Sequence, residues 1–386
     1  MLKIMEDEIE KSKTNYHTPF NINNYNQLLK SIDKKRQNSN YEKKNLSSNY
    51  IIIDTEINDV GDLLELISKY TIEEHIKYNI NMKSLHDIKE PLIELNNMIG
   101  MKQLKKDVVN QILYFIQGFN KNTKKINDLI DVEVINCDYM HTLIYGPPGT
   151  GKTEIARILG KLFSKLGILS KGTFKKVTRS DLIAGYVGQT SLKTRTVINE
   201  NLGGVLFIDE AYALGSNSEK KDSYSKECID TICEALSDHK DNLMVIIAGY
   251  EHELREYFFN FNQGLESRFT WRFKTDDYTG EDLYKIFIKK INDIEWSIHE
   301  NSNINAEWFV KNFEKFTFYG RDIETFLAKT KIAHSKRVFC KCDSEKKKLT
   351  IEDMENGLQI FLMNNETKLK KENDLFKKEL QYSIYC

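Results

Sequence analysis

The stretch at residues 146–153 reads Gly-Pro-Pro-Gly-Thr-Gly-Lys-Thr, which is the G-x-x-x-x-G-K-T pattern of a phosphate-binding loop. Its glycines allow positive φ angles and let the backbone come close to an anion. The amides of the loop and of the next helix then point at the phosphates. We expect Lys152 to reach the β- and γ-phosphates and the Thr153 hydroxyl to bind Mg²⁺. The predicted nucleotide-binding residues of this stretch are Gly146, Pro147, Pro148, Gly149, Thr150, Gly151, Lys152, Thr153 and Glu154.

The segments on either side of this loop have the patterns that the motif requires. Residues 140–145 are a short, largely apolar run suited to a buried strand. Residues 154–163 carry apolar side chains at helical spacing. The order strand, loop, helix argues against a chance turn that happens to end in Lys-Thr.

A second motif, Val205-Leu206-Phe207-Ile208-Asp209-Glu210, places two carboxylates after a four-residue apolar run. Ligands bind at the carboxyl ends of strands in open α/β sheets. We expect Asp209 to hold the Mg²⁺ shell, directly or through water, and Glu210 to orient and deprotonate an attacking water. The pair therefore favours hydrolysis over transfer to a small molecule.

Composition limits the other classes of function. The 386 residues carry a net charge of −1, so no overall field favours nucleic acid or an anionic membrane. No run approaches the ~20 apolar residues of a membrane span, and the first residues show no signal peptide. The six cysteines are scattered, and Cys340-x-Cys342 lacks the second pair of a zinc site. These features predict a cytoplasmic protein in a reducing compartment.

Strands and helices alternate through the middle of the chain, which predicts an α/β fold with a doubly wound, parallel, five-stranded sheet. The predicted strands are 140–145, 173–178, 205–208, 243–248 and 271–274. The predicted helices between them are 152–165, 191–201, 226–238 and 251–259.

The rest of the chain suggests four parts. Residues 1–88 form a polar, partly disordered N-terminal segment that could be an adaptor, 89–279 the α/β nucleotide-binding domain, 280–365 a small all-helical lid, and 366–386 a charged tail. Pro91 marks the first boundary, the pattern of 92–119 is helical, and 120–137 has the composition of a polar loop. The predicted lid helices are 281–291, 305–316, 321–337 and 350–363.

With both motifs placed, residues 90–340 resemble an AAA+ P-loop ATPase. The resemblance is strongest to the group that contains the red-type rubisco activase and the stage V sporulation protein K. It is carried by four stretches, Arg179–Thr190, Gly203–Leu214, Ile247–Tyr250 and Gly264–Phe269.

The resemblance implies roles for residues that the nucleotide motifs do not cover. Tyr186, Val187 and Gly188 match an aromatic pore loop that grips a polypeptide in the channel of a ring. A tyrosine buried in a strand–helix connection is the alternative. Ile99 and Gly100 match the segment that contacts adenine, which implies ATP as the nucleotide.

Three further positions follow from the same resemblance. Arg268 matches an arginine finger that would reach the γ-phosphate on a neighbouring subunit, although Arg268 or Arg272 could instead form a surface ion pair. Arg321 matches the sensor-2 arginine of the lid. Tyr250 stands at the sensor-1 position, where many AAA+ proteins have asparagine, so the group that polarises the water stays open.

Together these features predict an ATPase with ATP and Mg²⁺ as cofactors. The resemblance implies that the chain assembles with itself into a ring, as a hexamer. Such a ring would remodel or thread an unidentified protein substrate, with no membrane partner. A nucleic-acid motor or clamp-loader-like ATPase is one alternative. A scaffold that binds ATP without hydrolysing it is another, which an intact Glu210 disfavours.

Overall fold

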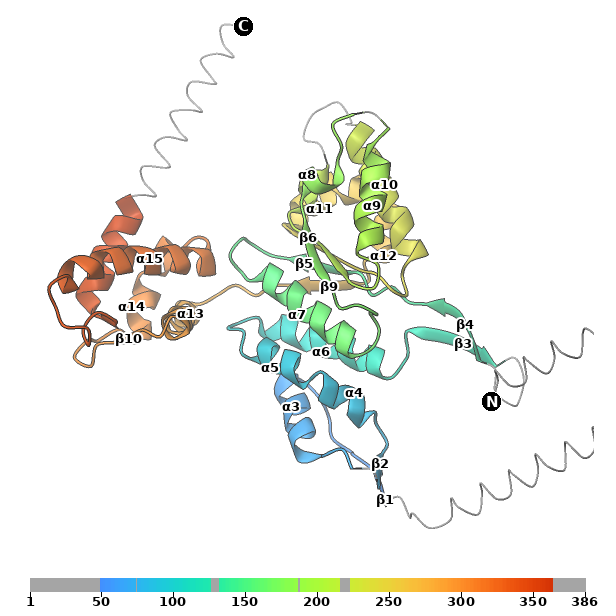
Figure 1. The fold of residues 1–386 in the computed structure, drawn as a ribbon, viewed down its shortest axis with the longest axis horizontal. Helices are drawn as coiled ribbons and strands as arrows, with labels where there is room; N and C mark the ends of the chain where they lie inside the picture. The colour runs from blue at the N-terminus through green and yellow to red at the C-terminus, as the bar shows by residue number, and fades with distance from the viewer. Residues whose placement is uncertain (1–48, 74, 126–131, 187, 216–222, 364–386) are drawn as a thin grey trace, which may run out of the picture. The chain divides into compact units, whose positions relative to one another are not determined.

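The computed structural model describes residues 49–363 apart from 74, 126–131, 187 and 216–222. Its centre is a five-stranded parallel sheet, of which Figure 1 labels β5, β6 and β9. The order of the strands is β6-β7-β8-β5-β9. The strands are β5 (Thr142–Tyr145), β6 (Phe174–Val177), β7 (Val205–Ile208), β8 (Met244–Gly249) and β9 (Trp271–Lys274). The sheet confirms the predicted fold class, and each strand lies within two residues of its predicted bounds.

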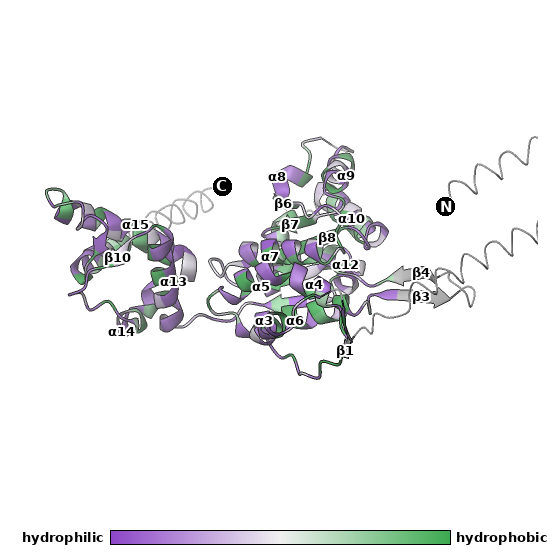
Figure 2. Cartoon of the chain, turned by 60° about the horizontal axis from the view of Figure 1, so that its bottom comes forward, coloured by the Kyte–Doolittle hydropathy of each residue, from purple (hydrophilic) through white to green (hydrophobic). Residues whose placement is uncertain are grey.

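Alternate residues of the strands divide the core into two layers, because successive side chains point to opposite faces of a sheet. Leu143, Leu206 and Val245 belong to a cluster that also holds residues of α9 (Thr190–Glu200), α10 (Ser223–Asp238) and α12 (Gly264–Arg268). On the other face, α7 (Lys152–Lys165) passes so close to Val205 that a Cβ on Gly160 would lie 3.0 Å from its methyl. Figure 2 shows β7 and β8 in the hydrophobic colour among helices that carry both colours.

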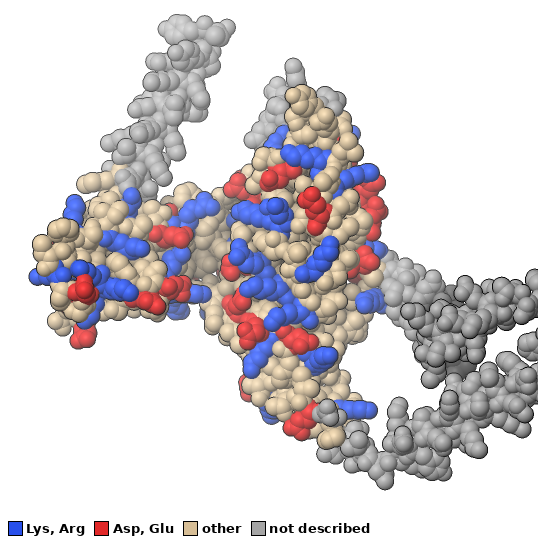
Figure 3. Space-filling view, viewed as in Figure 1, with Lys and Arg blue, Asp and Glu red and all other residues tan. Residues whose placement is uncertain are grey.

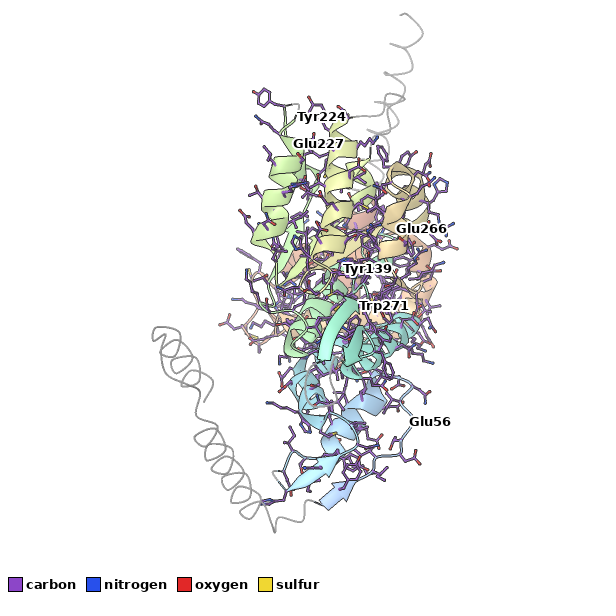
Figure 4. The ribbon with its side chains drawn as sticks, turned by 90° about the vertical axis from the view of Figure 1, so that its right-hand side faces the viewer. Glu56, Tyr139, Tyr224, Glu227, Glu266 and Trp271 are labelled. Atoms are coloured by element: carbon purple, nitrogen blue, oxygen red, sulfur yellow. The ribbon has the colours of Figure 1, made fainter. Side chains whose placement is uncertain are left out.

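Short helices follow the ends of several strands. These are α8 (Arg179–Leu182), η1 (Ala211–Leu214), α11 (Glu251–Tyr257) and η2 (Phe259–Phe261). At the amino end of β9, Trp271 Nε1 donates to the carbonyl of Tyr139 at 3.2 Å, and Figure 4 shows the two residues next to each other. This contact ties β9 to the segment that enters β5.

Two predictions about residues 89–137 were wrong. The helical pattern of 92–119 is broken into α5 (Lys89–Asn96) and α6 (Lys102–Ile116), because Gly100 and Met101 adopt left-handed φ angles of 70° and 56°. Pro91 lies in the first turn of α5, where its missing amide costs no hydrogen bond, so it does not precede the helix.

The predicted polar loop at 120–137 contains an antiparallel pair, β3 (Lys121–Lys125) and β4 (Val132–Cys137). Its register shifts between Asn122 and Thr123. The segment 121–125 reads Lys-Asn-Thr-Lys-Lys, which lacks the alternation of apolar and polar residues that would indicate a strand.

The lid begins at α13 (Gly280–Asp293), where Thr279 and Asp282 form a capping box. It continues through α14 (Ala306–Lys311), η3 (Phe313–Lys315), α15 (Tyr319–Val338) and a helix over 351–363. Besides these helices it contains a two-residue parallel ladder, β10 (Ser297–Ile298) with β11 (Lys348–Leu349). Its core is aromatic, with Phe309, Phe316, Phe326 and Phe361 all at most 1% exposed.

The segment before residue 89 includes two helices that belong to the same compact unit as the sheet and the lid. They are α3 (Val60–Lys69), which buries Val60, Leu63, Leu66 and Ile67, and α4 (Met82–Asp87). A separate unit contains the parallel pair β1 (Asn49–Ile51) and β2 (Ile76–Tyr78). Residues 1–48 and the tail at 366–386 lie outside the described residues, and the boundaries at 88, 279 and 365 stay predictions.

No helix in the described part of the chain is both long enough and apolar enough to cross a membrane.

Candidate nucleotide-binding site

The phosphate loop joins the end of β5 to the start of α7. Gly149 and Gly151 have φ angles of 79° and 83°, in the left-handed region that side chains with a Cβ disfavour. A Cβ on Gly149 would lie 2.0 Å from the carbonyl oxygen of Phe318, and the Gly149 carbonyl accepts from Gly320 N at 3.2 Å. The loop therefore touches the start of α15 in the lid through backbone atoms.

Lys152 is the first residue of α7, and its ammonium folds back over the loop. Its Nζ donates to the carbonyls of Gly146 and Pro147, both at 2.8 Å. Burial lowers the pKa of the Lys152 ammonium, whereas the carboxylates of Asp209 and Glu210 act in the opposite direction. A positive charge so placed, near the amino end of a helix, is suited to bind phosphate.

Asp209 and Glu210 follow β7, at the same edge of the sheet as the phosphate loop. Glu210 has a φ angle of 51°, an unusual value for a residue with a side chain, of the kind that clusters at active sites. The Asp209 Oδ2 atom accepts from Lys176 Nζ at 2.6 Å. Sequence reasoning missed Lys176, although its position in the strand beside β7 could have indicated it.

These groups open on a cavity of about 460 Å³. Eleven of its lining residues were predicted from the sequence: Ile99, Pro148, Gly149, Gly151, Lys152, Thr153, Glu154, Asp209, Glu210, Tyr250 and Arg321. Three other predicted residues, Gly146, Pro147 and Thr150, do not line the cavity. They form hydrogen bonds within the loop and with Lys152.

The oxygen donors at this edge fit a small divalent cation. Thr153 offers a hydroxyl and Asp209 a carboxylate, and Mg²⁺ prefers one or two such groups together with phosphate oxygens and water. Among the described residues no group of three or more His, Cys, Asp or Glu side chains could hold a metal by itself. Mg²⁺ bound to Thr153 and Asp209 would take the rest of its shell from phosphate oxygens and water.

Arg321 and Tyr250 line the cavity together with Glu210. Arg321 is exposed and lies in the first turn of α15. The Tyr250 ring lies 6.2 Å from the ring of Tyr212, a cavity residue that the sequence analysis missed. Burial raises the pKa of both phenols, with help from nearby carboxylates that include Glu210, so both hydroxyls stay protonated and can donate to a water.

Apolar residues that are far apart in sequence also line the cavity. Ile99 and Met98 line it, together with Ile286 of α13 and Tyr278. Gly100 lies outside the lining, but a Cβ there would come 2.8 Å from the Tyr278 ring. The Tyr278 hydroxyl donates to the carbonyl of Thr150 at 3.3 Å, so this tyrosine links the phosphate loop to the entry of the lid.

Tyr278 and Ile286 were also missed. Ile286 belongs to the apolar pattern of the predicted helix 281–291, and Tyr278 directly precedes the capping box of that helix. Both signals indicate burial without indicating what the residue contacts.

Arg268 is not among the residues that line this cavity. It ends α12, where its Nε donates to the Ser237 hydroxyl at 2.7 Å and its Nη1 to the carbonyl of Gly264. Arg272 instead forms an ion pair with Glu266 at 3.1 Å, so the surface ion pair considered for this region belongs to Arg272.

Tyr186 lies in the connection between α8 and α9 with 73% of its surface exposed. The alternative of a buried tyrosine is therefore wrong. Gly188 is described, with a φ angle of 78°, and Val187 lies outside the described residues. At the start of α8, Arg179 Nη1 donates to the carbonyls of Ala213 and Leu214 in η1, which begins directly after Glu210.

Comparison with known proteins agrees with this geometry. The sequence model of the ATPase family associated with various cellular activities (AAA) matches residues 142–274. The chain is 38% identical to the cfxQ-like protein R730 of Acanthamoeba polyphaga mimivirus, over 74% of this chain and 68% of that protein. It is 34% identical to stage V sporulation protein K of Bacillus subtilis, over 58% of this chain and 66% of that protein.

Among solved structures, the chain resembles the FIGL-1 AAA domain in complex with ADP. The TM-score is 0.46 at 19% identity, over 69% of this chain and 83% of that one.

Proposed function

This chain belongs to the AAA family and hydrolyses ATP with Mg²⁺, and we propose that it does so as a hexameric ring that remodels a protein substrate. Members of this family commonly assemble into rings. The observation that carries the proposal is the exposed Tyr186. Its loop follows α8, and α8 is hydrogen-bonded through Arg179 to η1, the segment directly after Glu210.

In the proposed reaction the chain's own groups divide the work. Lys152 and the loop amides bind the phosphates, while Thr153 and Asp209 hold the cation, which when bound neutralises phosphate charge. Glu210 takes the proton of the attacking water. Tyr250 and Tyr212, which both line the cavity, would donate hydrogen bonds to that water and so take the role left open by the missing asparagine.

Two contacts would carry the state of the nucleotide to other parts of the chain. Arg321 and the bond from Gly320 to the phosphate loop connect it to the lid. The Arg179 side chain connects η1 to α8 and so to the Tyr186 loop. A change around Glu210 would thus move the loop that we propose to grip the substrate.

Arg268 would complete the site from the neighbouring subunit. Within one chain its side chain is held by neutral acceptors on α10 and α12, away from the cavity. An arginine that reaches a neighbour's γ-phosphate adds positive charge where negative charge develops in the transition state.

The charge distribution supports a protein as the substrate. The sequence carries 56 basic and 57 acidic residues, and on the face drawn in Figure 3 the two signs are interspersed. A nucleic-acid motor needs a basic track along which phosphates can bind.

Tyr186→Ala tests the proposed grip. It removes a large apolar surface and leaves the nucleotide site intact, so basal ATPase activity should stay within a few-fold while remodelling of a protein substrate is lost. Tyr186→Phe should be far milder, because packing needs the ring and not the hydroxyl. The matched control is Tyr50→Ala, an equally drastic change at a tyrosine that is 61% exposed on β1.

Normal remodelling by folded Tyr186→Ala would contradict threading through this loop. ATPase stimulation by DNA or RNA that weakens with salt would favour the nucleic-acid alternative.

A further inference from the structure

Lys176 is held in place by two contacts at the carboxyl edge of the sheet. In the register of β6 and β7 it stands opposite Phe207, and its Nζ lies 5.9 Å from the centre of that ring. The same Nζ donates to Asp209 Oδ2 at 2.6 Å. The Lys176 side chain is 46% exposed and the Asp209 side chain 23%, so solvent screens this ion pair only in part.

This ammonium is separate from that of the phosphate-loop lysine. Lys152 donates to loop carbonyls, whereas Lys176 reaches Asp209 from the neighbouring strand. The carboxylate to which we assign the Mg²⁺ shell therefore already carries a positive partner supplied by the chain.

An ammonium and a hydrated Mg²⁺ are both positively charged, and both donate hydrogen bonds to the oxygens of a carboxylate. Magnesium keeps several of its waters, and their hydrogens need acceptors such as the oxygens of Asp209. A lysine ammonium has three donors and no acceptor, so it cannot bind those waters and repels the ion. Repulsion between the two positive charges therefore makes them compete for Asp209.

The structure also has room for the displaced side chain. Lys176 lines a second cavity, of about 690 Å³, together with Asp209, Thr178 and Ser180. The two hydroxyls can accept hydrogen bonds from an ammonium that has left the carboxylate.

We propose that Lys176 competes with Mg²⁺ for Asp209, so that it occupies this carboxylate in the nucleotide-free enzyme and raises the Mg²⁺ concentration that ATP binding needs. The inference rests on the assignment of Asp209 as the group that holds the cation shell. It makes Lys176 a residue that sets the metal requirement of the enzyme.

The test measures the binding of a fluorescent non-hydrolysable ATP analogue to the full chain as Mg²⁺ is raised from zero. Lys176→Met keeps the length of the side chain and its packing on Phe207 but removes the charge. It should lower the Mg²⁺ concentration at half-saturation roughly two- to fivefold, the size of a partly exposed ion pair.

Two variants control for charge and for folding. Lys175→Met removes the same charge one residue earlier, where the side chain points to the opposite face of the strand, and should leave the half-saturation value unchanged. Lys176→Arg keeps the charge and should stay close to wild type. If Lys176→Met raises the Mg²⁺ requirement, Lys176 serves the phosphates and the proposal is wrong.

A shift in Lys176→Met equal to that in Lys175→Met would also overturn it. Asp209→Asn separates this failure from that of the proposed site. If Asp209→Asn leaves the Mg²⁺ dependence unchanged, the assignment of Asp209 fails. If it abolishes that dependence while Lys176→Met behaves as Lys175→Met, only the competition fails.

Discussion

The carboxyl edge of the sheet and the helix α12 differ in how they present charged groups. At the edge, five segments of one chain bring Ile99, Lys152, Asp209, Tyr250 and Arg321 around a single cavity. At α12, Arg268 is fastened to the Ser237 hydroxyl and a carbonyl, and does not line that cavity. The edge gathers its groups within one chain, whereas the role that we propose for Arg268 requires the cavity of a neighbouring chain.

The largest expected effect is on catalysis, when the Arg268 side chain at the end of α12 is removed. Arg268→Ala should leave ATP binding intact and reduce kcat by ~10³-fold or more, as for the loss of an arginine finger. Arg272→Ala is the matched control, since it removes a similar side chain whose ion pair with Glu266 is exposed and worth less than about 1 kcal/mol. Steady-state ATPase kinetics decide, and equal losses in the two variants would contradict the role of Arg268.

The second prediction concerns the edge itself. Glu210→Gln should bind ATP with near-normal affinity and lose about 10²- to 10⁴-fold in turnover, because it removes the base and keeps the shape. Lys152→Ala should weaken ATP binding instead, since it removes the charge that faces the phosphates. Calorimetric titration and single-turnover assays separate the two effects, and wild-type turnover by Glu210→Gln would refute the assignment of the base.

A third prediction concerns His141, whose protonated form is disfavoured by burial and by the charge of Arg268. His141 is fully buried, accepts from Val245 N at 3.1 Å and lies 2.9 Å from the Leu236 carbonyl. Burial lowers the pKa of His141 from 6.5 to about 4. The unfolded chain therefore binds more protons between these pH values, and stability is complete above pH 6.5 and is lost as pH falls toward 4.

As the pH falls from 7.5 to 5, protonation of this histidine in the unfolded chain should lower the free energy of unfolding by about 2 kcal/mol. His141→Asn should flatten that part of the pH profile in urea denaturation. His252→Asn, at a side chain that is 85% exposed, is the control for the loss of an imidazole outside the core. An unchanged slope in His141→Asn would show that this histidine does not resist protonation in the folded state.

The smallest expected effect is on stability, when the hydrogen bond between Tyr278 and the phosphate loop is removed. Tyr278→Phe deletes one hydrogen bond to the Thr150 carbonyl, so it should cost about 0.5–1.5 kcal/mol of stability. It keeps the ring that packs on Gly100, and ATP affinity should fall only slightly. Thermal unfolding with and without nucleotide measures both, and a loss much larger than one hydrogen bond would mean that the hydroxyl does more than link the loop to the lid.

The sequence predicted the parts of the site that lie in continuous motifs. The phosphate loop, Asp209 and Glu210 each follow a buried apolar strand, and the spacing of such motifs specifies local backbone geometry and the edge of the sheet. Tyr278, Ile286 and Lys176 were missed because their roles arise from contacts between distant segments, which no local pattern encodes.

The fold was predicted with similar limits. Three of the five strands, β5, β7 and β8, are hydrophobic runs buried on both sides, which periodicity detects well. The β3–β4 pair was missed because the sequence of β3, Lys-Asn-Thr-Lys-Lys, contains no apolar residue. The break between α5 and α6 depends on Met101 in a left-handed conformation, which its side chain does not indicate.

Mixing two inactive variants tests the central claim most directly. Lys152→Ala cannot bind ATP well, and Arg268→Ala cannot complete a neighbour's site. In a mixed ring some interfaces pair an intact pocket with an intact Arg268, so ATPase activity should partly return when the variants are combined. Full inactivity of mixtures whose co-assembly has been verified would show that Arg268 acts within its own chain, or not at all, and would contradict a site shared between subunits.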